Sequence, residues 1–204
     1  MKIKFTLSIL ALMSVLTTLT AQSFKKSQLD INIGLGLGNT FLTRGYDRSL
    51  PAISTSVEYG ITDEISIGGY LGYTGATYKY YGTEWCDNGN HYGNPYRELY
   101  NYTDTYSWNY YIVGVRGAYH FSRFIKNEKL DVYVGALLGN NFAHYTYSTN
   151  SVCHDHYSYV NRTNAGFIFS VYGGARYRFT EHIGAFAEVG YGISYLTAGL
   201  NLKF

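Results

Sequence analysis

The segment Leu-Thr-Ala-Gly-Leu-Asn-Leu-Lys-Phe at residues 196–204 alternates apolar side chains with polar or very small ones. Successive side chains of a β-strand point to opposite faces, so this period of two predicts a strand with one apolar face. The apolar face carries Leu, Ala, Leu, Leu and Phe, whereas the other face carries Thr, Gly, Asn and Lys. The end of the chain therefore predicts a β-strand that is covered on one side only.

The same alternation recurs along the chain between short runs of turn residues. It is found at residues 31–38, 53–61, 65–74, 111–121, 132–139, 167–179 and 183–192. The composition agrees, because 24 Tyr favour strands, 23 Gly disfavour helices, and Pro occurs only twice. In the segment 132–139 Val132, Val134, Ala136 and Leu138 oppose Tyr133, Gly135, Leu137 and Gly139, but both faces are apolar, so the pattern leaves open which face points inward. The sequence predicts an all-β fold, an eight-stranded antiparallel up-and-down barrel.

The contents of the two faces indicate which one meets lipid. After residue 21 no run of 18 apolar residues occurs, so no membrane-spanning helix is expected. A closed β-barrel is the other structure that satisfies every backbone polar group in hydrocarbon. One face of the predicted strands is bulky and apolar, while the other carries mainly Gly, Ser, Asn and isolated charges, which cannot fill a dry core. We therefore predict a transmembrane barrel with a narrow polar lumen.

The predicted connections alternate in length. Residues 62–64, 122–129 and 180–182 are short connections, and residues 43–50, 80–106 and 144–163 are longer ones. Transmembrane barrels have short periplasmic turns and longer outer loops, so the long connections are expected outside the cell. The connection near Ile193 is short and departs from this trend.

The start of the chain predicts export. Lys2 and Lys4 precede an apolar run at residues 5–16, which is too short to span a bilayer and is typical of a signal peptide. We expect residues 1–21 to be removed by cleavage between Ala21 and Gln22, which leaves 22–204 as one barrel domain. The two lysines account for the excess of 16 basic over 14 acidic residues, so the mature chain is formally neutral. A neutral chain without a basic patch is not expected to bind nucleic acid.

The alternating C-terminus, with Leu200, Leu202 and the final Phe204, resembles the signal by which outer-membrane assembly machinery recognises barrels. The stretches 114–121 and 130–135 resemble small outer-membrane β-barrel proteins common in Bacteroidetes, and more distantly the barrel domain of outer membrane protein A. This resemblance covers residues 29–204. It implies residence in the outer membrane, contact with its lipid and lipopolysaccharide, insertion by the barrel assembly machinery, and no shared catalytic residues.

Charged residues on the predicted lumen face are the first candidate site. They are Glu58, Arg116, Arg176, Arg178, Glu188 and Lys203. Asp30 and Asp131, near strand ends, are expected to balance the basic excess. Eight strands leave room only for side chains, so a network of ion pairs that plugs the lumen is favoured. A plugged lumen predicts that the protein has a structural or cell-surface interaction role. The alternative is a small passive, porin-like channel for ions or small solutes.

The two cysteines, Cys86 and Cys153, fall in two long connections that are neighbours around the rim. An oxidising compartment then predicts a disulfide between them. The run 153–156 (Cys-His-Asp-His), with His91 and His144 as helpers, also fits a Zn²⁺ or Cu²⁺ site. A solvated polar loop is the favoured reading, and no metal or cofactor is expected.

The long connections are rich in tyrosine. One holds Tyr78, Tyr80, Tyr81, Tyr92, Tyr96, Tyr100, Tyr102 and Tyr106, and the other holds Tyr145, Tyr147, Tyr157 and Tyr159. An aromatic girdle that continues into strand extensions above the membrane is the favoured interpretation. The alternative is a contact surface for a glycan or a host protein, because Tyr offers a large amphipathic area at low entropic cost.

The stretch His120-Phe121-Ser122 is similar to the His-x-Ser of outer-membrane lipid A deacylases. A hydrolase of this kind needs a carboxylate that orients the base and a nucleophile beside the substrate. The motif lies at the predicted periplasmic end of its strand, and the sequence pattern indicates no matching acid. We therefore predict no catalytic residue and no enzymatic activity.

Overall fold

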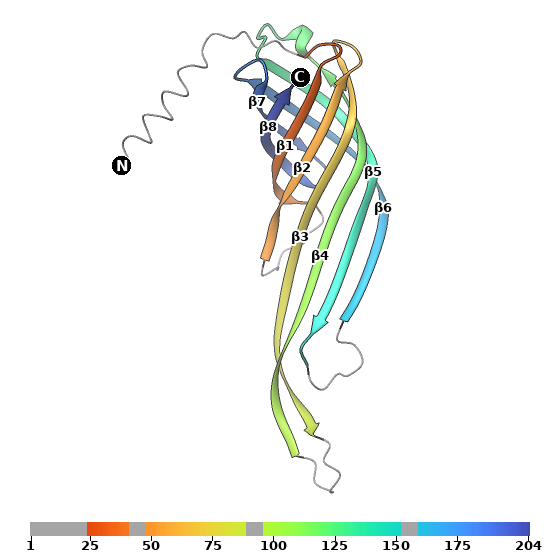
Figure 1. Ribbon diagram of the computed structural model, residues 1–204, viewed down its shortest axis with the longest axis vertical. Coiled ribbons are helices and arrows are strands. Elements are labelled where there is room, and N and C mark those ends of the chain that lie inside the picture. The colour runs from red at the N-terminus through yellow and green to blue at the C-terminus, as the bar shows by residue number, and fades with distance from the viewer. Residues whose placement is uncertain (1–23, 41–47, 89–95, 152–158) are drawn as a thin grey trace, which may run out of the picture.

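The computed structural model describes residues 24–40, 48–88, 96–151 and 159–204, in which eight antiparallel strands close into one barrel in sequence order (Figure 1). The strands are β1 (Leu29–Asn39), β2 (Arg48–Gly60), β3 (Ile65–Asn88), β4 (Tyr96–His120), β5 (Leu130–Thr149), β6 (Tyr159–Arg178), β7 (Ile183–Gly190) and β8 (Ser194–Lys203). A 3-10 turn, η1 (Ser122–Phe124), joins β4 to β5. The predicted all-β, eight-stranded architecture is confirmed.

The first and last strands close the ring. In the β1–β8 pairing Ile33 lies opposite Leu200, and Ile31 lies opposite Leu202. At the end of this seam the backbones of Leu29 and Phe204 exchange two hydrogen bonds of 3.0 and 2.8 Å. The barrel therefore leaves no free edge between its termini, as a sheet in hydrocarbon requires.

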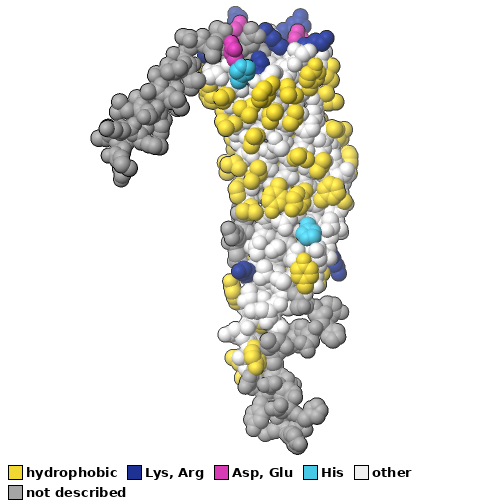
Figure 2. Space-filling view, in the orientation of Figure 1, with side chains coloured by type: hydrophobic (Ala, Val, Ile, Leu, Met, Phe, Trp, Pro, Cys, Tyr) yellow, Lys and Arg dark blue, Asp and Glu magenta, His cyan; other side chains and the backbone are white. Residues whose placement is uncertain are grey.

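The outward face of the barrel is an apolar belt (Figure 2). Its exposed aliphatic side chains include Ile33, Leu35, Ile53, Val57, Ile67, Leu71, Val113, Val115, Val134, Leu138, Val171, Val189 and Leu200. Exposed rings border the belt near the short turns, at Tyr59, Tyr119, Tyr177, Phe179 and Phe204. A second set borders it toward the long connections, at Tyr111, Phe142, Phe167, Tyr191 and Tyr195. Two aromatic girdles around an apolar band are typical of a barrel that spans a membrane.

Strands β3, β4, β5 and β6 continue well beyond the other four (Figure 1). β3 and β4 have 24 and 25 residues and β5 and β6 have 20 each, whereas β7 has 8. We call residues 74–88, 96–110, 143–149 and 159–166 the strand extension. The predicted connections 80–106 and 144–163 are therefore too long, because much of each is paired strand. Thr and Tyr favour strands, and cross-strand pairs sustain the ladder without an apolar belt.

The short-turn end of the barrel is covered by the residues before β1. The backbone N–H of Ser27 donates to the Gly60 carbonyl at 2.8 Å, and that of Lys26 donates to Asp63 Oδ1 at 2.9 Å. These bonds direct Phe24 inward, where it is buried. The predicted signal peptide and the cleavage site at Ala21 and Gln22 lie outside the described residues. Within the described ranges, no helix has the length and apolar character needed to cross a membrane.

Candidate functional site

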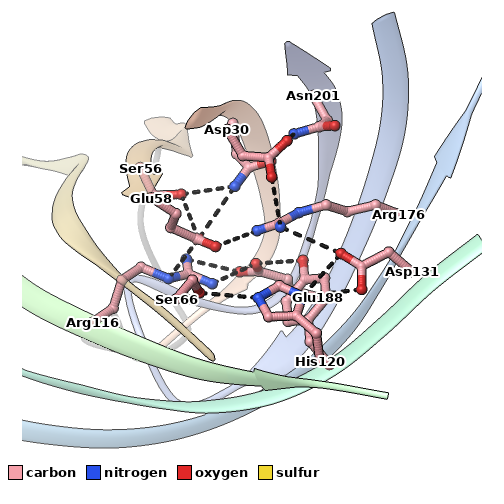
Figure 3. A network of polar contacts seen from close by, with 12 residues as sticks. Asp30, Ser56, Glu58, Ser66, Arg116, His120, Asp131, Arg176, Glu188 and Asn201 are labelled. Atoms are coloured by element: carbon pink, nitrogen blue, oxygen red, sulfur yellow. Dashed lines mark hydrogen bonds and ion pairs between the residues drawn. The ribbon is translucent and has the colours of Figure 1, made fainter. Parts of the chain in front are cut away.

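Seven charged side chains meet inside the barrel. We call them the lumen network: Asp30, Glu58, Arg116, Asp131, Arg176, Arg178 and Glu188. They come from six different strands, and most of them converge in Figure 3. The strand alternation that turns apolar side chains toward the belt turns these residues into the lumen, where six of the seven are buried and Glu188 is partly buried.

Arg176 holds a central place in the network and is fully buried. Its Nη2 donates to Glu58 Oε2 at 2.5 Å, and its Nη1 lies 3.5 Å from a carboxylate oxygen of both Asp30 and Asp131. The guanidinium also lies 4.3 Å from the centre of the Tyr133 ring. A cation without water needs such compensation, because burial of an unpaired charge is very costly.

Arg116 forms a second centre in the network. Its Nε lies 3.0 Å from Glu58 Oε1, and its two terminal nitrogens donate to the Glu188 carboxylate at 2.7 and 3.3 Å. Its guanidinium lies 3.9 Å from the centre of the Tyr172 ring. Tyr133 donates to Glu188 Oε1 at 2.7 Å. Glu58 thus bridges the two arginines, and β2 is tied across the lumen to β4, β6 and β7.

Arg178 and Asp30 extend the network toward the short-turn end. Arg178 Nη2 lies 3.4 Å from Asp30 Oδ1, which also accepts from Asn201 Nδ2 at 3.1 Å. Gln28 donates to Asp30 Oδ2 at 2.5 Å. Lys203, opposite Asp30 in register, is only half-buried and lies at the rim of this cluster.

Very little space remains beside the network. A cavity of about 30 Å³, lined by Tyr70, Arg116, Glu188 and Ser194 among others, could hold one or two waters. Toward the long connections the lumen is occupied by buried aliphatic side chains of Ile112, Leu137, Ile168 and Ile193. The lumen in the described residues is therefore filled, first by paired charges and then by an apolar layer.

His120 joins three strands near the short turns. Its Nδ1 lies 3.0 Å from both oxygens of Asp131, and its Nε2 lies 3.0 Å from Ser66 Oγ. The expectation that no acid accompanies this histidine is wrong, because Asp131 follows it across the β4–β5 connection. The bonded serine is Ser66, while Ser122 donates to Asp131 at 3.2 Å.

This Ser-His-Asp connectivity is the one that hydrolases use, yet its surroundings differ from an active site. Ser66, His120 and Asp131 are at most 1% exposed. The ring of Phe24 stacks on His120 with 3.7 Å between centroids and 3° between planes. A nucleophile must reach a substrate carbonyl, and Ser66 is enclosed. The arrangement instead satisfies buried polar groups on β3, β4 and β5.

Most aromatic side chains of the strand extension lie on one of its two faces. By alternation, the positions that continue the lumen side carry Tyr78, Tyr80, Tyr100, Tyr102, Tyr106, Trp108, Tyr145 and Tyr147, with Glu84 and Asp104. We call this set the aromatic face. The opposite side is rich in Thr, Ser and Asn, with pairs such as Thr77–Ser107 and His144–Thr163. The favoured prediction of strand extensions above a girdle agrees with this arrangement.

The rings of the aromatic face contact one another across strands. Tyr106 lies 5.0 Å from Tyr147 and 6.2 Å from Tyr78 between ring centres, and Trp108 lies 5.5 Å from Tyr145. The Tyr147 hydroxyl donates to Asp104 at 3.0 Å. Burial among the rings, together with the Asp104 carboxylate, raises the pKa of Tyr106 and Tyr147. Both phenols therefore keep their protons, and can donate hydrogen bonds, at neutral pH.

The sequence matches the family described as outer membrane protein beta-barrel domain over residues 8–204. The chain belongs to that family. The description of the family agrees with the apolar belt, the aromatic girdles and the closed ring of this structure. The protein is therefore an outer-membrane barrel whose belt faces lipid.

Two solved structures are similar in fold. One is the N-terminal β-barrel domain of Pseudomonas aeruginosa OprF, at 16% identity and a TM-score of 0.44, which covers 88% of this chain and 98% of that one. The other is Ail, the attachment invasion locus protein of Yersinia pestis, at 9% identity and a TM-score of 0.48, over 88% and 99%. No curated protein matches the sequence.

The structure places the other predicted site residues as follows. Leu200 and Phe204 of the outer-membrane barrel are exposed on the belt, and Leu202 is half-buried beside them. The side chain of Cys86 and all of Cys153 lie outside what the structure describes, as do His91 and the run 153–156. Among described residues, no group of three His, Cys, Asp or Glu is placed to hold a metal.

Several residues of the lumen were not singled out from the sequence. Tyr133 and Tyr172 cover the two central guanidiniums, and Asn32 and Asn201 donate within the carboxylate cluster. Alternation already assigns all of these positions except Tyr133 to the lumen face, so the signal was present as polar or aromatic residues beside charged ones. Their partners lie across the ring, which no local pattern indicates.

Proposed function

We propose that this protein is a closed outer-membrane barrel that acts at the cell surface through its strand extension and not through its lumen. The observation that carries this proposal is the filled interior. Arg176 and Arg116 are held by Glu58 at 2.5 and 3.0 Å, and the free cavity beside them is only about 30 Å³. The apolar layer at Ile112, Leu137, Ile168 and Ile193 adds a second block.

Planar-bilayer recordings of the purified full-length protein test this proposal. We expect no steady openings, because a hydrated ion finds neither a continuous water path nor unpaired charges to replace its hydration shell. A double variant that truncates the apolar layer and the central cation, Ile112→Ala with Arg176→Ala, serves as the comparison. Steady, sizeable openings of the unmodified barrel would overturn the closed lumen and favour the small passive channel.

The remaining roles extend this proposal. Leu200, Leu202 and Phe204 form the signal read by the barrel assembly machinery, and the belt contacts outer-membrane lipid and lipopolysaccharide. Signal cleavage frees Gln22 before insertion. No cofactor and no enzymatic reaction are part of the proposed function. Deletion of Phe204 is expected to reduce insertion, and unchanged amounts of heat-modifiable, folded barrel in the outer membrane would contradict this role.

A disulfide between Cys86 and Cys153 is also proposed, as a link between the two long connections of the strand extension. In the oxidised full-length protein we expect both thiols to resist alkylation until a reductant is added. Alkylation of both thiols in the absence of reductant would contradict the proposed disulfide. The link would restrain the ends of β3 and β6, and so would support the extension as a contact surface.

A further inference from the structure

The side chains of the aromatic face indicate which class of partner it binds. This inference rests on the proposed role of the strand extension at the cell surface. Between residues 78 and 84, 100 and 108, and 145 and 149, every position on this face is Tyr, Trp, Gly, Thr or a carboxylate. None is aliphatic. Each ring thus presents an apolar π-face together with a hydroxyl or an indole N–H.

The rings lie against the sheet instead of standing free. A side chain at Gly82 would overlap the ring of Tyr102, its partner in register, so that ring lies across the β3 backbone. Tyr80 lies 6.2 Å from Tyr102 between ring centres and is 48% exposed. The planes of Tyr106 and Trp108 differ by only 16°. Rings supported in this way keep a face open to solvent at little entropic cost on binding.

Carboxylates accompany the rings. Asp104 accepts from Tyr147, and Glu84 accepts from Ser151. On β6, Arg162 pairs in register with Tyr145 and so shares this face as its basic side chain. Two carboxylates beside one guanidinium give the face no positive charge that would favour binding of a polyanion. The carboxylates are, however, strong hydrogen-bond acceptors for neutral hydroxyl groups.

We propose that the aromatic face binds an uncharged oligosaccharide chain. The C–H faces of pyranose rings carry partial positive charge and stack on the negative faces of Tyr and Trp. The sugar hydroxyls then donate to Asp104 and Glu84 and accept from Tyr hydroxyls. Tyr and Trp are also common in protein interfaces, but the centres of such interfaces are depleted of Asp and Glu, so Asp104 and Glu84 among the rings favour a glycan. Stacked rings at intervals along β3 and β4 suit an extended chain of several sugars.

The two tryptophans make the test direct. Trp108 lies on the aromatic face, and Trp85, 65% exposed, lies on the opposite face of the strand extension. In a Trp85→Phe background, the emission of the full-length barrel in nanodiscs reports on Trp108 alone. The probes are cellohexaose, maltohexaose and hexa-N-acetylchitohexaose, with a heparin hexasaccharide as the anionic comparison. We expect a saturable change with at least one neutral probe, little affected by salt.

Matched variants locate the site. Tyr80→Ala and Tyr102→Ala on the aromatic face should weaken binding about tenfold or more. Tyr81→Ala, next in sequence but on the opposite face and 71% exposed, should leave it unchanged. Gel-mobility shifts on heating show that each variant is folded.

Other outcomes overturn the inference. These are no saturable response to any neutral probe, an equal loss in Tyr81→Ala, or tighter binding of the heparin fragment that salt abolishes. A bound glycoprotein whose affinity survives enzymatic removal of its glycan would indicate a protein partner instead. None of these results would contradict the proposal that the lumen is closed, because that proposal is tested separately by the conductance measurement.

Discussion

Arg176 on β6 and Glu58 on β2 meet across the lumen, with 2.5 Å between Nη2 and Oε2, although 118 residues separate them in the chain. Glu58 also lies 3.0 Å from Arg116 on β4. Glu58 thus pairs with two buried guanidiniums and connects three strands, while Asp30, Asp131 and Glu188 supply the rest of the negative charge. A barrel that holds its charges this way is stabilised from within, in addition to the lipid contacts of its belt.

Glu58→Gln should reveal the importance of this carboxylate. The substitution preserves shape but leaves Arg176 and Arg116 short of a negative partner, so we expect the free energy of unfolding to fall by about 3–5 kcal/mol. Urea unfolding in lipid vesicles measures it. Glu64→Gln is the control, since its pair with Arg123 is 3.4 Å long and exposed, and is worth less than about 1 kcal/mol. Equal stability of the two variants would contradict the structural role of the lumen network.

Phe24→Ala should open the short-turn end of the barrel. The Phe24 ring covers His120, and its loss would admit water and small reagents to that imidazole. Diethyl pyrocarbonate labelling read by mass spectrometry is expected to modify His120 in the variant and not in the unmodified protein. His182, which is exposed, should react equally in both. Strong labelling of His120 in the unmodified protein would show that Phe24 does not seal the lumen.

Neighbouring glycines of β3 should respond differently to a methyl group. A Cβ at Gly68, on the lumen face, would overlap the Val57 carbonyl oxygen, whereas a Cβ at Gly69 meets nothing within 4 Å. Gly68→Ala should therefore cost about 1–3 kcal/mol through overpacking, or prevent folding, and Gly69→Ala should be close to neutral. Heat-modifiable mobility and urea midpoints compare them. Similar values for the two variants would mean that the β2–β3 contact relaxes easily.

Arginine substitutions on one face of β3 should mark the edge of the membrane. Leu71→Arg places a charge on the belt and should cost up to about 2–4 kcal/mol, depending on its depth in the bilayer. Thr83→Arg, exposed on the same face but in the strand extension, should have little effect because water solvates it. Unfolding from lipid vesicles provides the comparison. A penalty at Thr83 as large as that at Leu71 would argue that the extension lies in lipid.

Strand alternation predicted much of this molecule correctly from local signals. Arg116, Arg176, Arg178 and Glu188 alternate with apolar neighbours, which predicts that they point into the lumen, and the structure has them there. In the segment 132–139, where the pattern leaves the phase open, the structure has Tyr133 and Leu137 inside. The connections were harder to delimit. Residues 80–88 and 96–106 pair as strands although they lack the apolar alternation by which the others were found.

The period-two pattern is visible in the order of residues alone, and it is enough to predict the barrel, the lipid-facing belt and the set of side chains that point inward. The folded barrel is needed to show which of those side chains meet, because partners such as Glu58 and Arg176 are brought together by ring closure. It also revealed Asp131 and Ser66 on either side of His120, and the aromatic face beyond the girdle. Alternation is a property of each strand alone, whereas contacts across the lumen and stacking across strands depend on the register of all eight.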